Sequence, residues 1–348
     1  MPQWAGSCWY YLRYIDPENE SVLVSPEAER YWMGEHGVDL YVGGVEHAVL
    51  HLLYARFWHK VLFDLGHVTT REPFGRLFNQ GYILADAFQD ERGVYVEASD
   101  VIERDGAHFL GDDEVTRVYG KMGKSLKNSV NPDEIFEEYG VDTLRLYEMF
   151  MGPLDTSRPW STRDIVGVHR FLQRVWRNFI DPDSGELLIS DEPSSGELEM
   201  LLHKTIEAVT TDMENLHFNT AVARLFELNN ALVGEERIAE DVASVFPRLL
   251  APMAPHITEE LWHRMGHHES IAKASWPTYD PELITEETTT MVVQVNGKVR
   301  DRLEVPVSIT EDEAVELALA SDRVKAHTGG APPRKVIARL PNVVSLVV

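Results

Sequence analysis

The sequence predicts a multidomain chain in which an α/β part (residues 1–155), an all-α part (156–287) and a small α+β part (288–348) follow one another. Three observations support this prediction. A short apolar strand pattern leads through two adjacent glycines into a helical pattern in the first part, and amphipathic helices with short connections fill the second. The third part has a hairpin signal, a helix-capping motif and two further strand patterns.

The α/β part is built around a strand–glycine–helix connection. Residues 39–42 read as a buried strand, Gly43 and Gly44 end it, and apolar residues then recur every three or four positions from 45 to 62, as in a helix. In this geometry backbone N–H groups at the helix start face a ligand. Ligands of doubly wound α/β sheets bind at such connections.

Two histidines, His47 and His51, lie four positions apart in the same predicted helix. A zinc-protease helix needs a glutamate directly after the first histidine or directly before the second, and here Glu46 precedes both. We therefore expect no metal site. Between residues 86 and 119 a polar stretch with alternating apolar residues predicts a small β insert.

A lysine-rich loop, residues 120–128, follows this insert and is called the signature loop below. It contains three lysines, two glycines and a serine, and Asn131 and Pro132 then mark the start of a helix. Mobile ammonium groups on such a loop can hold a polyphosphate. A P-loop is excluded, because its first glycine would fall on Val118. An ordinary solvated basic loop is the alternative.

The all-α part is predicted from amphipathic patterns that follow two short helices at 134–139 and 142–151. Ser161 is expected to cap a helix that ends at Phe179. Four more helices with short loops indicate a bundle, at residues 197–215, 219–233, 236–250 and 256–265.

The last part begins with two strands, 291–295 and 299–305, which flank Asn296-Gly297, a signal for a type I′ hairpin. Thr310 and Glu313 form a predicted capping box for a helix that ends at Ala320. Residues 336–340 and 343–348 are predicted strands.

Composition limits the possible functions. The single cysteine, Cys8, excludes an intramolecular disulfide and a cysteine-based zinc site, and it fits a reducing cytoplasm. No apolar stretch reaches the length of a membrane span, and the first residues do not resemble a signal peptide. The formal net charge is −25, yet residues 291–348 carry eight Lys/Arg against seven Asp/Glu. Any RNA contact is therefore expected on small basic patches.

Residues 121–125 (Lys-Met-Gly-Lys-Ser) resemble the signature loop Lys-Met-Ser-Lys-Ser of class I aminoacyl-tRNA synthetases, with Gly123 in place of the first serine. In that family the loop closes over ATP, and its lysines stabilise charge on the pyrophosphate as the amino acid attacks the α-phosphate. Residues 43–57 are similar to the corresponding segment of bacterial leucyl-tRNA synthetases. The isoleucyl, valyl and methionyl relatives carry different residues there.

The resemblance implies ATP-dependent activation of leucine and its transfer to tRNA(Leu), with ATP and Mg²⁺ as cofactors. It implies catalytic roles for Lys121, Lys124 and Ser125. The residues implied to bind ATP are Lys124, Gly43, Gly44, Glu46 and His47. Those implied to bind leucine are Trp4, Ser7, Tyr10 and His51. Phosphates of tRNA are expected to meet Lys298, Arg300, Arg334, Lys335 and Arg339 in the last part.

The resemblance covers the chain, but it extends only to the latter part of a leucyl-tRNA synthetase: the second half of a Rossmann-like class I catalytic core, a helical bundle of the anticodon-binding type and a small C-terminal domain. The first half of the catalytic domain, with its histidine signature, and the editing domain have no counterpart here. We therefore expect a cytoplasmic monomer that is inactive without its missing N-terminal half. The alternatives are a non-catalytic RNA-binding protein derived from a synthetase and one subunit of a naturally split enzyme.

Overall fold

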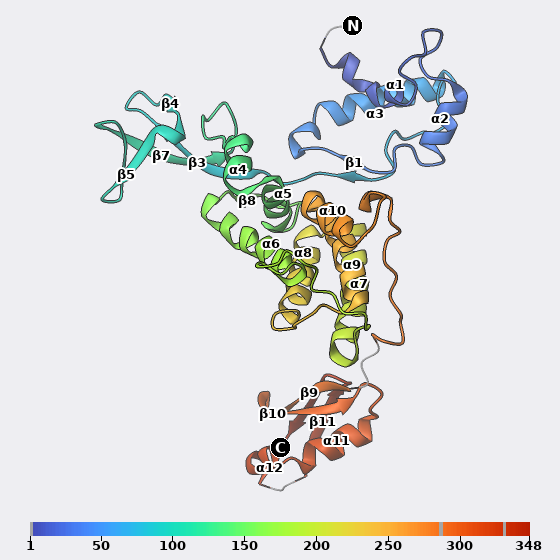
Figure 1. The fold of residues 1–348 in the computed structure, drawn as a ribbon, viewed down its shortest axis with the longest axis vertical. Coiled ribbons are helices and arrows are strands. Elements are labelled where there is room, and N and C mark those ends of the chain that lie inside the picture. The colour runs from blue at the N-terminus through green and yellow to red at the C-terminus, as the bar shows by residue number, and fades with distance from the viewer. Residues whose placement is uncertain (1–2, 285–287, 330–331) are drawn as a thin grey trace. The chain divides into compact units, whose positions relative to one another are not determined.

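The computed structural model describes residues 3–284, 288–329 and 332–348 (Figure 1). The chain divides into two compact units. One comprises Met1–Leu198 and Thr205–Pro277, and the other comprises Glu199–Lys204 and Thr278–Val348. Within the part of the chain that the structure describes, no helix is long and apolar enough to cross a membrane.

The chain begins with short helices that pack on a longer one. A 3₁₀ segment, η1 (Gln3–Cys8), leads into α1 (Tyr10–Tyr14), and α2 (Pro26–Met33) follows. Their core contains Tyr11, Leu12 and Met33, together with Leu62 and Val68 from the end of α3 (His51–Asp64) and the segment after it. Burial of these apolar side chains fixes the aromatic N-terminal segment beside α3.

The predicted strand–glycine–helix connection is present in a modified form. Strand β1 (Tyr41–Val42) pairs in parallel with β2 (Leu77–Phe78), and α3 lies between them in the sequence. The prediction of a continuous helix from residue 45 was wrong. Residues Val45–His47 form a 3₁₀ turn, η2, and Leu50, with φ −102° and ψ −80°, is not helical, so the α-helix starts only at His51.

The predicted β insert forms most of a six-stranded sheet. The sheet comprises β3 (Ile83–Gln89), β4 (Tyr95–Val96), β5 (Val101–Arg104), β6 (Ala107–Leu110) and β7 (Asp113–Lys121), with η3 (Ala98–Asp100) before β5. Its sixth strand, β8 (Arg158–Pro159), comes from a later part of the chain. The strand order is β4-β3-β7-β6-β5, and β8 pairs with β3. In the antiparallel β3–β7 pair, Leu84 lies opposite Lys121, so the first lysine of the signature loop is the last residue of a strand.

The helices after the signature loop largely follow the predicted pattern. They are α4 (Pro132–Tyr139), α5 (Val141–Phe150), α6 (Ile165–Phe179), α7 (Gly196–Glu214), α8 (Phe218–Ala231), α9 (Glu240–Leu250) and α10 (Pro255–Arg264), with 3₁₀ turns η4 (Thr162–Asp164) and η5 (Ile271–Lys273). Asn131 caps α4 as predicted, because its side chain accepts a hydrogen bond from the Asp133 N–H. Large buried side chains, among them Phe171, Phe179 and Phe246, fill the core.

Two predicted helix starts were wrong. Ser161 makes no side-chain cap, and its backbone N–H and C=O instead bond the Tyr147 hydroxyl, so η4 comes first and α6 begins at Ile165. Helix α9 begins at Glu240, four residues later than expected, because Ile238 pairs with Ile189 in a β-bridge. In both cases a partner distant in the sequence outcompetes the local helical preference.

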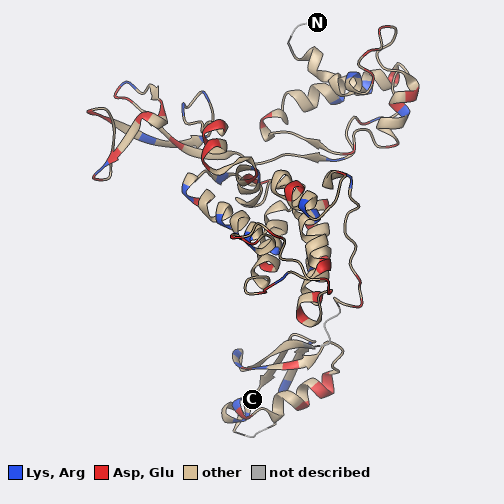
Figure 2. Ribbon diagram, viewed as in Figure 1, with Lys and Arg blue, Asp and Glu red and all other residues tan. Residues whose placement is uncertain are grey.

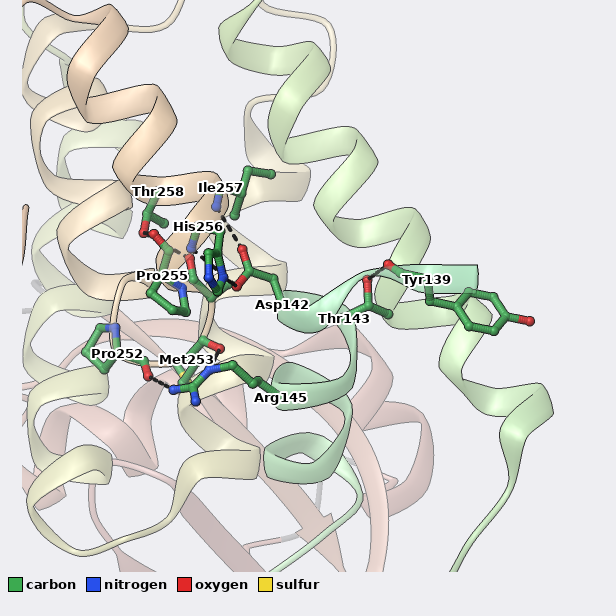
Figure 3. A network of polar contacts seen from close by, with 11 residues as sticks. Tyr139, Asp142, Thr143, Arg145, Pro252, Met253, Pro255, His256, Ile257 and Thr258 are labelled. Atoms are coloured by element: carbon green, nitrogen blue, oxygen red, sulfur yellow. Dashed lines mark hydrogen bonds and ion pairs between the residues drawn. The ribbon is translucent and has the colours of Figure 1, made fainter. Parts of the chain in front are cut away.

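Helix α5 is clamped to the start of α10 (Figure 3). The Asp142 carboxylate accepts hydrogen bonds from the His256 N–H, the Ile257 N–H at 2.7 Å and the His256 ring at 2.8 Å. One turn further along α5, Arg145 donates to the carbonyls of Pro252 and Met253. These bonds satisfy free backbone groups around a helix terminus and tie the segment that follows the signature loop to helices more than 100 residues later in the chain.

The last unit contains β9 (Thr288–Val295), β10 (Lys298–Pro306), α11 (Glu311–Ala320), α12 (Asp322–Thr328), β11 (Lys335–Arg339) and β12 (Val343–Val347). The sheet order is β10-β9-β12-β11. Asn296 and Gly297 both have positive φ, 50° and 77°, which confirms the type I′ hairpin. The capping box of Thr310 and Glu313 is also confirmed, whereas α12 was not predicted.

Gly81 provides a test of how the segment before β3 packs against the segment before β8. A Cβ at Gly81 would overlap the backbone of Thr156 and Ser157, and the Gly81 N–H already donates to Leu154. We expect Gly81→Ala to lower the free energy of unfolding by about 1–3 kcal/mol, as other overpacked sites do. Gly167→Ala is the control, because Gly167 lies in α6 with open space around it. Thermal unfolding should show a lower midpoint for the first variant only, and equal midpoints would contradict this packing.

Candidate functional site

A cavity of about 440 Å³ lies between the N-terminal segment and the strand–glycine connection, and is called the N-terminal cavity below. All four side chains expected to bind leucine line it. Gly43, Gly44 and His47, which were expected at the ATP site, line it too. The complete lining is Trp4, Ser7, Tyr10, Tyr41, Val42, Gly43, Gly44, His47, His51, Leu52 and Gln80.

A chain of hydrogen bonds crosses one wall of the N-terminal cavity. The hydroxyl groups of Tyr10 and Tyr41 are 2.6 Å apart, and the Tyr41 hydroxyl is 2.7 Å from His51 Nε2. Tyr41 and His51 also stack, with ring centroids 6.0 Å apart. Tyr41 was not anticipated from the sequence, although it is the strand residue two positions before Gly43 and its place in the predicted strand was the available signal.

Charge is disfavoured along this wall. His51 is only 8% exposed, and burial lowers its pKa, with a smaller contribution from the charge of His47. Burial also raises the pKa of Tyr41, and the hydrogen bond between the Tyr10 and Tyr41 hydroxyl groups raises it further. Both side chains are therefore neutral at pH 7. A neutral wall favours an apolar side chain over a charged one.

Gln80 gives the N-terminal cavity one unsatisfied acceptor. Its Oε1 is buried and has no hydrogen-bond partner among the described residues. A buried acceptor without a partner costs free energy, which a ligand donor would recover. Nothing in the sequence pattern distinguished Gln80 beforehand.

The signature loop is linked to the strand–glycine connection by an ion pair. Lys121 Nζ lies 2.7 Å from Glu46 Oε1, and the Lys121 ammonium also lies 4.4 Å from the centroid of the Tyr82 ring. The hydrogen bond from Lys121 lowers the pKa of Glu46. Gly44 permits this arrangement, because a Cβ there would overlap the Glu46 carboxylate. Tyr82 thus holds the lysine through a cation–π contact.

A buried asparagine organises the rest of the signature loop. Asn128 is 3% exposed; its Oδ1 accepts from the Gly123 N–H at 2.9 Å, and its Nδ2 donates to the Ala85 carbonyl at 3.2 Å. Gly123 has no positive φ and has open space at its Cβ position, so the backbone does not require glycine there.

The two expected catalytic lysines differ in their surroundings. Lys121 is paired with Glu46, whereas Lys124 and Ser125 are exposed, and neither makes a side-chain hydrogen bond or ion pair with any described residue. The Lys124 ammonium is therefore available to an anion as the loop stands. No group of three or more His, Cys, Asp and Glu in the described ranges could hold a metal ion.

The residues expected to contact tRNA do not form one cluster. Lys298 and Arg300 lie on β10, and Lys335 and Arg339 lie on β11 with Arg334 just before it. These strands are the two outer strands of the four-stranded sheet. The structure therefore separates the five residues into two basic groups.

The chain is similar to tRNA ligases over nearly its whole length. Residues 197–316 match the family described as the anticodon-binding domain of tRNA ligase. The chain is 56% identical over 360 aligned positions to the leucine–tRNA ligase of Saccharopolyspora erythraea, covering 99% of this chain and 38% of that protein. It is 55% identical to the leucine–tRNA ligase of Streptomyces coelicolor, covering 100% of this chain and 37% of that one.

A solved structure agrees with these matches. The chain superposes with a TM-score of 0.73 and 28% identity on Agrobacterium radiobacter K84 agnB2 LeuRS in a ternary complex with tRNA and LeuAMS. The match covers 99% of this chain and 42% of that one. The chain thus spans well under half the length of the relatives it matches.

The two buried histidines predict a pH dependence. Burial lowers the pKa of His51 and of His59, whose Nδ1 bonds the Tyr11 hydroxyl and whose Nε2 bonds Thr70. The unfolded chain therefore takes up protons below about pH 6.5 that the folded chain does not, and stability is lost as pH falls through that value. We expect the thermal unfolding midpoint to drop by several degrees between about pH 7.5 and about pH 5.5.

The control for this prediction is the double variant His51→Gln, His59→Gln, measured at both pH values. Its midpoint at neutral pH should be lower than that of the original chain, but the change in midpoint with pH should shrink. An unchanged pH dependence in the double variant would assign the effect to other groups.

Proposed function

We propose that this homologue of the leucine–tRNA ligases supplies the leucine side-chain pocket and the ATP-closing loop of such an enzyme, and so takes part in leucine activation and its transfer to tRNA(Leu). One observation carries the proposal. Trp4, Ser7, Tyr10 and His51 line one cavity together with Gly43 and Gly44, and the Glu46–Lys121 ion pair links that connection to the signature loop.

The N-terminal cavity is suited to a branched apolar side chain. Its aromatic walls and the neutral His51–Tyr41 pair provide apolar contact without a buried charge. We assign the unsatisfied Gln80 oxygen to a donor on the bound amino acid or its adenylate. The pocket would thus select for an apolar side chain by burial and orient the ligand by hydrogen bonds.

The reaction proposed is attack of the leucine carboxylate on the α-phosphate of ATP, with cleavage of the bond to the β-phosphate and release of pyrophosphate. Gly43, Gly44, Glu46 and His47 would lie along the nucleotide. Lys124, with Lys121 and Ser125 beside it, would stabilise the charge that grows on the pyrophosphate. Mg²⁺ would enter with the phosphates, as is usual for this ion.

Lys124 is the residue on which this proposal is most directly tested. In an enzyme reconstituted from this chain and the remaining segment of a relative, we expect Lys124→Ala to lower kcat of leucine-dependent ATP–pyrophosphate exchange by about 100-fold or more. The KM for leucine should change little, because the contact strengthens mainly in the transition state. Lys127→Ala is the control, since Lys127 Nζ lies 3.7 Å from Glu97 and contributes a loop charge that is already paired. A normal kcat for Lys124→Ala would remove the loop from catalysis.

We further propose that the chain works only with the segment that its relatives carry in addition. Leu53 and Phe57 lie four positions apart on α3 and are 58% and 66% exposed, and Val49, just before the helix, is 72% exposed. Large apolar side chains exposed in this way are typical of a surface that another segment covers. Leucine-dependent pyrophosphate exchange should therefore require mixing with the complementary segment. Exchange by the pure chain would contradict this, and no exchange in any mixture would favour a non-catalytic RNA-binding role.

The partners proposed are leucine, ATP and tRNA(Leu), with tRNA phosphates meeting the two basic groups of the last unit. We propose a cytoplasmic monomer. The free, buried Cys8 fits a reducing compartment.

A further inference from the structure

A second cavity lies in the helical bundle, where α9 and α10 meet the segment that begins with η5. Its volume is about 310 Å³, and it is called the bundle cavity below. It shares no residue with the N-terminal cavity. Small-molecule sites in proteins are concave and mostly apolar, with a few polar groups that orient the ligand.

Two side chains of opposite charge line the bundle cavity, Arg248 from α9 and Glu259 from α10. They are not paired with each other, and neither makes an ion pair with any residue that the structure describes. Figure 2 shows both signs of charge on α10, where the neighbouring Glu260 and Arg264 do pair, at 2.7 Å. The bundle cavity thus holds one cation and one anion that lack partners of opposite charge.

Arg248 keeps unused hydrogen-bond donors. Its Nε donates to the Ser244 carbonyl at 2.8 Å, and its two terminal nitrogens donate to Ser244 Oγ at 3.1 Å and to the Ser275 carbonyl at 3.2 Å. A guanidinium group has five N–H groups, so each terminal nitrogen retains one. Burial lowers the pKa of Arg248, because the charge is partly withdrawn from water. A carboxylate from outside would offset this cost and could take both remaining N–H groups.

Glu259 is engaged through only one of its two oxygens. Its Oε2 accepts from the Ser270 hydroxyl at 2.8 Å and from the Ile271 N–H at 3.1 Å, which holds the start of η5 on α10. Its Oε1 has no hydrogen-bond partner within the described ranges. The carboxylate can therefore accept from an ammonium group in the cavity without releasing η5.

The remaining lining is mainly apolar. It consists of alanine and proline side chains around the α9–α10 connection and after η5, together with Ile271 and Trp276. The Trp276 indole N–H donates to Thr210 Oγ1 at 2.8 Å, which fixes the ring at its edge. Trp276 is 37% exposed, so part of the ring is available to an apolar or aromatic group in the cavity.

We propose that the bundle cavity binds a free α-amino acid with a large apolar or aromatic side chain. The ligand carboxylate would bind Arg248, the ammonium group would bind Glu259, and the side chain would pack on Trp276. A ligand with only one of these charges would leave the other protein charge without a partner. The bound amino acid would join α9, α10 and the η5 segment. This binding is independent of the proposed function, because it involves none of the residues assigned to leucine or ATP.

Isothermal titration calorimetry of the full chain with L-phenylalanine tests this proposal. Two analogues report on the charges separately, since 2-phenylethylamine lacks the carboxylate and 3-phenylpropanoate lacks the ammonium group. We expect L-phenylalanine to bind about tenfold or more tightly than either analogue, as for the loss of a charged hydrogen bond. Arg248→Gln should abolish the preference over 2-phenylethylamine and keep the preference over 3-phenylpropanoate. Glu259→Gln should do the reverse.

Arg264→Gln and Glu260→Gln are the matched controls. They remove the same charges from α10, but these side chains pair with each other and do not line the bundle cavity, so binding should not change. Arg248→Lys should bind L-phenylalanine more weakly and still prefer it over 2-phenylethylamine, because the charge remains and the fork geometry is lost. Equal thermal midpoints would show that the variants fold.

Two outcomes would overturn this inference. Binding that persists in Arg248→Gln and Glu259→Gln but disappears in His51→Gln would assign the ligand to the N-terminal cavity and leave the proposed function intact. The absence of binding by the original chain, up to the solubility limit of L-phenylalanine, would also overturn the inference. Leucine-dependent pyrophosphate exchange by the reconstituted enzyme would still test leucine activation in either case.

Discussion

The antiparallel pairing of β3 with β7 is the constraint on which the candidate site depends. It places Lys121 opposite Leu84, next to Tyr82, and so delivers the signature loop to the strand–glycine connection. Asn128 then returns the loop to β3 through the Ala85 carbonyl. Both ends of the loop are therefore fixed to one strand, while Lys124 and Ser125 between them remain exposed. Lys124 and Ser125 can therefore move while the two ends of the loop stay attached to β3.

Features that depend on neighbouring residues could be predicted from the sequence, and features set by distant partners could not. The Asn296-Gly297 turn, the Thr310–Glu313 capping box and the Asn131 cap require only local backbone geometry, and all three are present. In contrast, Ser161 bonds to Tyr147, and Ile238 pairs with Ile189. Neither partner is visible in a helical periodicity, so both helix starts were placed too early.

The same distinction applies to the candidate site. Part of the lining of the N-terminal cavity was anticipated from the family resemblance: Trp4, Ser7, Tyr10, Gly43, Gly44, His47 and His51 all line it, whereas Tyr41 and Gln80 were not foreseen. The resemblance said nothing of the contacts that orient them, such as Tyr41 on His51 or Asn128 on Gly123. Those depend on three-dimensional proximity between segments whose sequence spacing carries no signal. Charge was likewise summed along the chain, which hid the three arginines of α6, a helix without aspartate or glutamate, within an acidic total.

The ion pair between Glu46 and Lys121 also sets how the signature loop can respond to a nucleotide. Its side chains are 41% and 51% exposed, so the pair contributes at most about 1 kcal/mol. A triphosphate carries several charges and accepts charge-assisted hydrogen bonds, which are individually worth more than this exposed contact. Anion binding can therefore draw Lys121 away from Glu46 at small cost, whereas Asn128 keeps the loop attached to β3. The weak Glu46–Lys121 ion pair can break while the buried Asn128 stays bonded to the Ala85 carbonyl, so the loop can close over a nucleotide without leaving β3.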